Sequence, residues 1–217
     1  AIQTLNRALA LNPKLSEAWF LRGMSYAALN HGREAVSDLS TAVRLNPKWD
    51  EAWMVLGVAQ RSTGETDLAI KSFSEAIRLN SNLAAAWFDR ACLYSETGND
   101  AKSLQDLDAV LQLEPNHDEA LLRHARALVH SRRDEAIENL SSILSRDRGN
   151  AEAWRLRGLC WNLTGDADRA LADLNTACRL QPDNYHPWLE RGRVLRTISR
   201  AEDAVSDLSK AVQLGPA

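Results

Sequence analysis

Few side chains in this sequence have the spacing that catalysis or metal binding needs. His124 and His130 are six residues apart, so a helix would place them on different faces. Cys92, Cys160 and Cys178 lie within apolar helical pattern, and no two of them have the spacing of a metal-binding pair. No H-E-x-x-H motif occurs, and no expected strand is followed by a glycine-rich phosphate loop. We therefore expect no enzyme activity, no metal site and no cofactor.

Arginine and aspartate recur together in a way that predicts ion pairs. An arginine stands sixteen residues before an aspartate in four places: Arg22 and Asp38, Arg90 and Asp106, Arg157 and Asp173, Arg191 and Asp207. Two equivalent places lack both residues and carry Leu56 with Ser72 and His124 with Asn139. Because the two residue types appear and disappear together, we expect a salt bridge in each of the four pairs. Such a bridge contributes about 0–1 kcal/mol when exposed and more when partly buried.

The elements that position these residues come from an internal repeat. Tryptophan recurs at intervals of 34 residues, with one interval of 67: Trp19, Trp53, Trp87, Trp154 and Trp188. A fixed period of this length indicates an array of one supersecondary unit. In residues 16–49, small or apolar side chains at spacings of three and four predict a helix that Asn30 interrupts. A second helix is expected to end at Asn46-Pro47.

Six such helix–turn–helix units follow a half-unit at residues 1–15, which matches a second helix alone. The units are residues 16–49, 50–83, 84–117, 118–150, 151–184 and 185–217. Acceptors and acidic side chains at their starts, such as Ser16 and Asp50, are expected to satisfy free helix N–H groups. Gly64, Gly98 and Gly165 are expected to end first helices in the left-handed conformation. Neither end carries a polar capping unit, so we expect a fragment of a longer protein.

The fourth unit is irregular. It has Leu121 in place of tryptophan, Arg148 in place of the closing proline, and one residue fewer between its helices. We interpret it as a drifted repeat that changes the superhelical pitch locally. The alternative is a basic hinge or docking spot at Ser131-Arg132-Arg133.

The repeat resembles the tetratricopeptide repeat (TPR), whose pattern is W-x2-L-G-x2-Y, followed by A-x3-F and P. Trp53, Leu56 and Gly57 match the first part in the second unit, and Ala69 with Phe73 match the second part. The match covers the whole chain in register. The resemblance implies an all-α fold, an α-solenoid in which antiparallel helix pairs stack into a right-handed superhelix. It also implies that the first helix of each pair lines a concave groove.

The composition excludes several classes of protein. Hydrophobic residues make up 45% and charged residues 25% of the chain, which is typical of neither a disordered nor a membrane protein. No apolar run approaches the roughly 18 residues that a bilayer span needs. The net charge of −3 gives no general attraction to nucleic acid or to anionic lipid. With cysteines that look reduced, we expect a cytoplasmic protein without a membrane or nucleic-acid partner.

The resemblance also implies which residues line the groove, because TPR ligands lie on unit positions two, five, nine, twelve and thirteen. The apolar side chains at these positions are Phe20, Met24, Met54, Val58, Phe88, Cys92 and Leu122. The basic ones, apart from Arg61, come later in the chain: Arg126, Arg155, Arg193 and Arg196. A contiguous exposed apolar patch commonly marks an interaction site. The alternative is that the apolar residues pack against neighbouring first helices and hardly meet solvent.

These features together predict a non-catalytic scaffold that binds a protein or peptide in the groove. The ligand would be amphipathic or extended, with apolar side chains on the first three units and acidic groups on the last three. Two alternatives remain at this stage. The chain could be the substrate-recruiting or regulatory arm of an enzyme, such as a glycosyltransferase or kinase, whose catalytic domain lies elsewhere. It could also be a self-association module.

Overall fold

The computed structural model describes residues 1–215, and within this range every regular element is an α-helix. Pro216 and Ala217, the end of the sixth expected repeat, lie outside the described residues. A lone helix, α1 (Ile2–Leu11), comes first. The first helices of the pairs are α2 (Ser16–Ala28), α4 (Asp50–Ser62), α6 (Ala84–Glu96), α8 (Asp118–Leu128), α10 (Ala151–Thr164) and α12 (Tyr185–Thr197). The second helices are α3 (Gly32–Leu45), α5 (Thr66–Leu79), α7 (Asp100–Leu113), α9 (Arg133–Arg146), α11 (Ala167–Leu180) and α13 (Ala201–Leu214).

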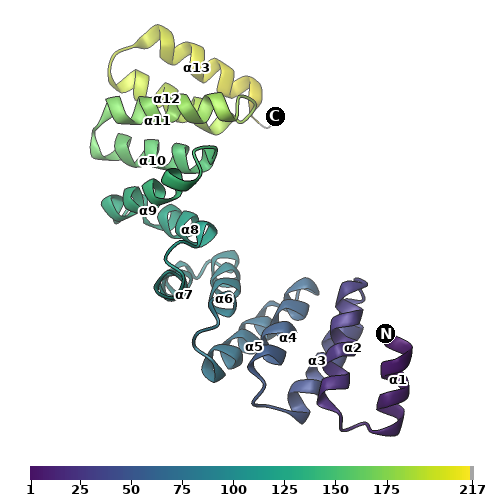
Figure 1. The fold of residues 1–217 in the computed structure, drawn as a ribbon. Helices are drawn as coiled ribbons and strands as arrows, with labels where there is room; N and C mark the ends of the chain where they lie inside the picture. Colours follow the sequence, from purple (N-terminus) through teal and green to yellow (C-terminus); the bar gives the residue numbers. More distant parts are fainter. Residues whose placement is uncertain (216–217) are drawn as a thin grey trace. The chain divides into compact units, whose positions relative to one another are not determined.

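The helices group into two compact units, residues 1–114 and the part that begins at Pro115. In the first unit α1 precedes three helix pairs, and the second unit contains three pairs (Figure 1). Each first helix packs most extensively against the second helix of its own pair, and that second helix then packs against the next first helix of the same unit. The fold is therefore an all-α solenoid of helix pairs, as the repeat predicts.

The turns within the pairs follow one geometry with a single exception. Gly64, Gly98 and Gly165 have φ of 80°, 75° and 88°, the left-handed conformation predicted for them. Asn30 and Ser199 adopt the same conformation at the equivalent places, with φ of 59° and 63°. Among the described residues the turn of the fourth pair has no residue of positive φ. Its first helix, α8, spans 11 residues instead of 13 or 14.

Helix starts differ in part from the prediction. Acidic side chains do lie in the first turns, as at Glu17 in α2 and Asp50 in α4. The expected capping by Ser16 and Asp50 is wrong, because both are already helical and follow Leu15 and Trp49, which make no side-chain cap. Side-chain caps occur instead at five helices, where the residue before the helix accepts from a backbone N–H: Asn99, His117, Asn150, Asp166 and Asn184.

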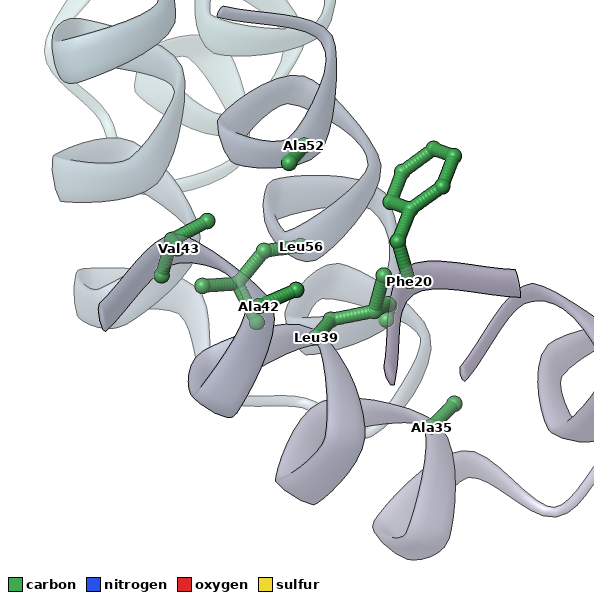
Figure 2. Packing of buried hydrophobic residues seen from close by; sticks show 8 residues of the cluster. Phe20, Ala35, Leu39, Ala42, Val43, Ala52 and Leu56 are labelled. Carbon is green, nitrogen blue, oxygen red and sulfur yellow. The ribbon is translucent and has the colours of Figure 1, made fainter. Parts of the chain in front are cut away.

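Within each unit the hydrophobic core runs from one pair into the next. Leu39 and Ala42 of α3 and Leu56 of α4 belong to one buried cluster and lie near one another between these helices (Figure 2). The partly buried rings of Trp19 and Trp53 pack against the same cluster. No pair encloses this cluster alone, so burial of apolar surface couples successive repeats.

Each tryptophan of the repeat also fixes the segment that precedes its helix. The indole Nε1–H donates a hydrogen bond to the backbone carbonyl six residues earlier, at 2.8–3.0 Å. In four of these places the acceptor is Pro13, Pro47, Ser81 or Pro182, and in the fifth it is Arg148. Arg148 therefore supplies the same carbonyl as a closing proline.

All four predicted arginine–aspartate salt bridges are confirmed. The Nε–Oδ2 distances are 2.6 Å for Arg22 and Asp38, 2.8 Å for Arg90 and Asp106, 2.7 Å for Arg157 and Asp173, and 2.6 Å for Arg191 and Asp207. In each pair the Nη2 atom binds the other carboxylate oxygen, so both contacts are parallel, and the pairs are largely buried. A bidentate geometry with little exposure makes these bridges stronger than surface pairs.

Two further contacts of these arginines were not predicted. The guanidinium carbon lies 4.7–4.9 Å from the centroid of the tryptophan ring three residues earlier. The remaining amino group, Nη1, donates to a side chain sixteen residues earlier, on the second helix of the preceding pair or, for Arg22, on α1: Asn6, Ser74, Ser141 or Asn175. Each arginine thus joins three helices.

The two repeats without this pair use other hydrogen bonds. In the second repeat Ser72 donates to Gln60 at 2.6 Å, and both side chains are buried. In the fourth, Asn139 Nδ2 and His124 Nδ1 are 2.8 Å apart, and the imidazole is buried. His124 therefore has a structural role that fits the position of a missing arginine.

Candidate interaction surface

The structure divides the predicted apolar residues of the first helices into exposed and buried ones. Met24 on α2 and Val58 on α4 are 42% and 44% exposed. Met54, Phe88 and Leu122 are half-buried. Phe20 and Cys92 are only 5% and 2% exposed, so they are packing residues and not part of an open surface.

Phe20 is buried because the residue that precedes the next first helix covers it. The ring of Trp49 lies 4.4 Å from the ring of Phe20, centroid to centroid, with a tilt of 41°. Figure 2 shows the Phe20 ring directed away from Leu39 and the rest of the labelled cluster. In the next repeat Met54 and Leu83 occupy the equivalent positions, and both pack against one buried cluster. The sequence placed Trp49 in the inter-repeat turn and did not indicate that its ring would cover Phe20.

An open pocket lies between the end of α2, the start of α3 and the second half of α4. It has a volume of about 540 Å³ and is lined by Ala27, Val55, Val58, Ala59 and Thr63, with Asn30, Gly32, Arg33 and Ser62 completing the lining. We call it the α2–α4 pocket. Exposed Met24 lies on α2 one turn before Ala27. The first-helix face of the first unit therefore offers an apolar, partly hollow surface.

The next repeat shows what fills the equivalent space. Arg61, the counterpart of Ala27, reaches from α4 to α6 and binds Asp89 at 2.9 Å and Glu96 at 3.2 Å. Burial raises the pKa of Asp89, and Arg61 offsets this only in part. Between α2 and α4 this ion cluster is absent, because Ala27, Val55 and Ser62 stand at the three positions.

Two of the four predicted groove arginines are already neutralised within the second unit. Arg155 on α10 binds Glu152 at 2.7 Å and also contacts Glu190 on α12. Arg126 on α8 binds the same Oε1 atom of Glu152 at 2.9 Å. The prediction that Arg126 and Arg155 await acidic groups of a ligand therefore loses its support. Within residues 1–215, Arg193 and Arg196 are exposed and form no ion pair.

The two glutamates of this cluster respond oppositely to their surroundings. Burial alone would raise the pKa of Glu152, but hydrogen bonds and charge from Arg155 and Arg126 outweigh it and hold that pKa below its usual value. Burial raises the pKa of Glu190 above its usual value, and Arg155 offsets only part of that rise. The Oε2 atom of Glu190 is buried and has no hydrogen-bond partner in the described structure.

We expect Glu152→Gln to destabilise the second unit by about 1–3 kcal/mol at neutral pH, because a largely buried guanidinium loses its bidentate partner. Glu190→Gln is expected to leave stability unchanged or to raise it. Because the folded pKa of Glu190 is raised, the protein loses stability as pH rises from below 4.5 through that pKa and Glu190 ionises. Because the folded pKa of Glu152 is lowered, Glu152 contributes stability that is lost as pH falls through that pKa. Urea unfolding of both variants at neutral and acidic pH measures the difference. Equal losses at neutral pH would contradict the assignment.

The cysteines have the packing role expected of them. Cys92, Cys160 and Cys178 are free and buried. Burial raises the pKa of the Cys160 and Cys178 thiols to about 11, so both are protonated and unreactive at neutral pH. Among residues 1–215, no three His, Cys, Asp or Glu side chains are grouped as metal ligands. No helix in this range is both long enough and apolar enough to cross a membrane.

Stacked helix pairs with a left-handed residue in most turns, and with a tryptophan bonded to the preceding turn in five of the six repeats, define a helical-repeat protein. Family models described as tetratricopeptide repeat match residues 20–84, 126–185 and 164–217, and a second such model matches residues 84–117. The chain belongs to the tetratricopeptide repeat family. None of the curated proteins compared with it matches in sequence.

Solved structures show the same fold at low sequence identity. YrrB, described as a TPR protein with an unusual peptide-binding site, has a TM-score of 0.78 and 19% identity over 86% of this chain and 97% of its own. A tetratricopeptide repeat protein from Parabacteroides merdae has a TM-score of 0.75 and 20% identity over 93% of this chain and 80% of its own. The APC/C hetero-tetramer Cut9-Hcn1 contains a chain with a TM-score of 0.64 and 19% identity, and the match covers 99% of this chain and 42% of that one.

Proposed function

We propose that this TPR protein is a non-catalytic interaction module that holds a peptide segment of a partner protein against its first helices. The observation that carries the proposal is the α2–α4 pocket beside exposed Met24 and Val58. A pocket with apolar walls and a few polar atoms at its rim suits an apolar side chain of a peptide. The similar fold of YrrB, which is described as binding a peptide, supports this general class.

The charged groups narrow the ligand further. In the first unit Arg33 is exposed at the lining of the pocket, so an acidic group next to the apolar side chain would be favoured. In the second unit, we propose that the exposed Arg193 and Arg196 bind acidic groups of the ligand. A cytoplasmic location is part of the proposal. The substrate-recruiting arm of an enzyme and the self-association module stay predictions.

The chain itself provides the variant that tests the proposal. The triple substitution A27R/V55D/S62E copies the Arg61, Asp89 and Glu96 ion cluster into the α2–α4 pocket and should fill it. Because Val55 also packs against the core of the first unit, far-UV circular dichroism of the variant checks that its helices are retained. We expect proteins captured from lysate of the source cells by the wild-type chain to be lost with this variant. For a purified captured partner, the Kd measured by calorimetry should rise at least about tenfold, which corresponds to about 1.4 kcal/mol.

A matched control separates a filled pocket from added charge. Val205 on α13 is 64% exposed, so Val205→Arg adds a charge elsewhere on the surface without filling a pocket. We expect this control to capture the same proteins as the wild type. Recovery of the same partners, with the same Kd, by the triple variant would overturn the proposal for the first-helix face.

A further inference from the structure

The opposite face of the first unit, formed by second helices, contains a cleft that differs from its counterparts. The cleft lies between α3 and α5 above α4 and has a volume of about 500 Å³. Its lining comes from Ser40, Val43 and Arg44 of α3, Pro47, Trp53, Leu56 and Gln60 in and before α4, and Leu68, Lys71, Ser72 and Glu75 of α5. We call it the α3–α5 cleft.

The equivalent clefts of the second unit are floored by an arginine. Arg157 lines the cleft between α9 and α11, and Arg191 lines the one between α11 and α13, each beside its repeat tryptophan. There the guanidinium covers the tryptophan ring, binds the aspartate, and donates to the preceding second helix. A polar, fully bonded group thus closes the floor of these clefts.

In the α3–α5 cleft that group is missing. Leu56 and Ser72 replace the arginine and aspartate, and Ser72 is already bonded to Gln60 at 2.6 Å. No cation within residues 1–215 covers the ring of Trp53 as Arg22 covers that of Trp19. The floor and walls that face solvent are therefore mainly apolar, and Leu68 on the rim is 44% exposed.

The rim carries cations that have no partner of their own. Arg44 and Lys71 are exposed and form no ion pair or hydrogen bond among the described residues. Glu75, the one acidic side chain of the lining, is paired with Arg78 at 2.8 Å. An apolar hollow between two free cations favours an apolar group with a negative charge close to it.

We propose that the α3–α5 cleft is a second peptide-binding site, which takes one aliphatic or aromatic side chain of a partner protein with a carboxylate in the adjacent residue. The side chain lies against Trp53 and Leu56 in the space that the guanidinium fills in four other repeats. The carboxylate meets Arg44 or Lys71 at the rim. The site is separate from the first-helix face and does not depend on it.

The test uses short peptides and the indole N–H resonance of Trp53, assigned through the Trp53→Phe variant. Acetyl-Glu-Phe-Glu-amide at millimolar concentration should shift this resonance. Acetyl-Lys-Phe-Lys-amide should bind several-fold more weakly because of the cationic rim, and acetyl-Glu-Ser-Glu-amide should leave the resonance in place. No shift with the first peptide, or equal binding of the first two, would overturn the proposal.

The decisive variant closes the cleft with the arginine–aspartate pair that four other repeats of the protein contain. L56R/S72D restores the arginine–aspartate pair, and Ser40 already stands sixteen residues before position 56 to accept the third contact. We expect the Kd of acetyl-Glu-Phe-Glu-amide to rise at least about tenfold. R44E/K71E changes two exposed side chains only, so it tests the rim even if the first variant folds poorly. Unchanged binding in R44E/K71E contradicts the proposal.

The proposals for the α2–α4 pocket and for the α3–α5 cleft can be tested independently of each other. A27R/V55D/S62E fills the α2–α4 pocket and should retain binding of the tripeptide to the α3–α5 cleft. L56R/S72D should retain the partners captured by the first-helix face. If a captured partner is lost with L56R/S72D and kept with A27R/V55D/S62E, the cleft is its binding site and the first-helix face is not.

Discussion

Replacing Asp173 with alanine is expected to lower the free energy of unfolding by about 3 kcal/mol, because Arg157 would remain as an uncompensated charge between three helices. The side chains of Arg157 and Asp173 are 18% and 7% exposed, so solvent can replace only part of the lost carboxylate. Arg157 would keep its contacts with Ser141 and the Trp154 ring, which cannot neutralise it. The midpoint of urea unfolding, followed by far-UV circular dichroism, measures the loss.

The matched variant removes both charges. R157L/D173A places an apolar side chain where Leu56 stands in the second repeat, and it should lie within about 1 kcal/mol of the wild type. The contrast between single and double variants isolates the cost of an unpaired charge from the value of the pair. A double variant as unstable as Asp173→Ala would show that the repeat needs the salt bridge itself.

Replacing Phe73 with alanine should cost about 3–5 kcal/mol, because the ring is fully buried and its loss leaves a cavity. Phe73 packs in the cluster of α5 and α6 and also covers Gly57 of α4. Phe73→Leu should cost much less, since leucine occupies this place in the other repeats, as at Leu107 and Leu140. Thermal and urea unfolding of the two variants give the comparison.

Gly57 provides the control for shape at this contact. A Cβ at Gly57 would lie 2.7 Å from Phe73 Cε1, so Gly57→Ala alone should be destabilising by about 1–3 kcal/mol. Combined with Phe73→Leu it recreates the pair of Ala91 and Leu107 found in the third repeat. A Cβ at Gly23 would also lie 2.8 Å from Leu39 Cγ, but a leucine can move aside more easily than a ring, so the alanine should be penalised less in this background. A cost for Gly57→Ala that is the same in both backgrounds would disprove close packing as its cause.

Much of the architecture could be predicted because the chain contains six copies of one unit. Helix positions, left-handed turns and the ion pair of Arg22 and Asp38 all follow from comparing copies, since residues that vary together within one repeat reveal a contact. The same comparison identified Leu56 with Ser72 as an exception. It did not reveal the hydrogen bond between Gln60 and Ser72 that replaces the ion pair.

The candidate site was less predictable because it depends on contacts between successive repeats. The position of a residue within the repeat predicts which side of the helix it lies on, but it does not predict which residues of the next repeat contact it there. Phe20 is covered by Trp49, and Arg155 is held by Glu152 and Glu190. Glu152 lies on the same helix as Arg155. The contacts of Phe20 with Trp49 and of Arg155 with Glu190, however, join residues whose relative position depends on how one pair stacks on the next. The open parts of the surface, Met24 and Val58, emerged only from their exposure.

The bond from each arginine to the preceding second helix has a mechanical consequence. Where Arg22, Arg90, Arg157 or Arg191 makes it, a directional contact resists rotation of one repeat against the one before. At the junction of α3 and α4, Leu56 makes only apolar contacts, which tolerate sliding. This is therefore the place within the first unit where a bending force meets the least directional resistance, and it is also the place where the α3–α5 cleft opens.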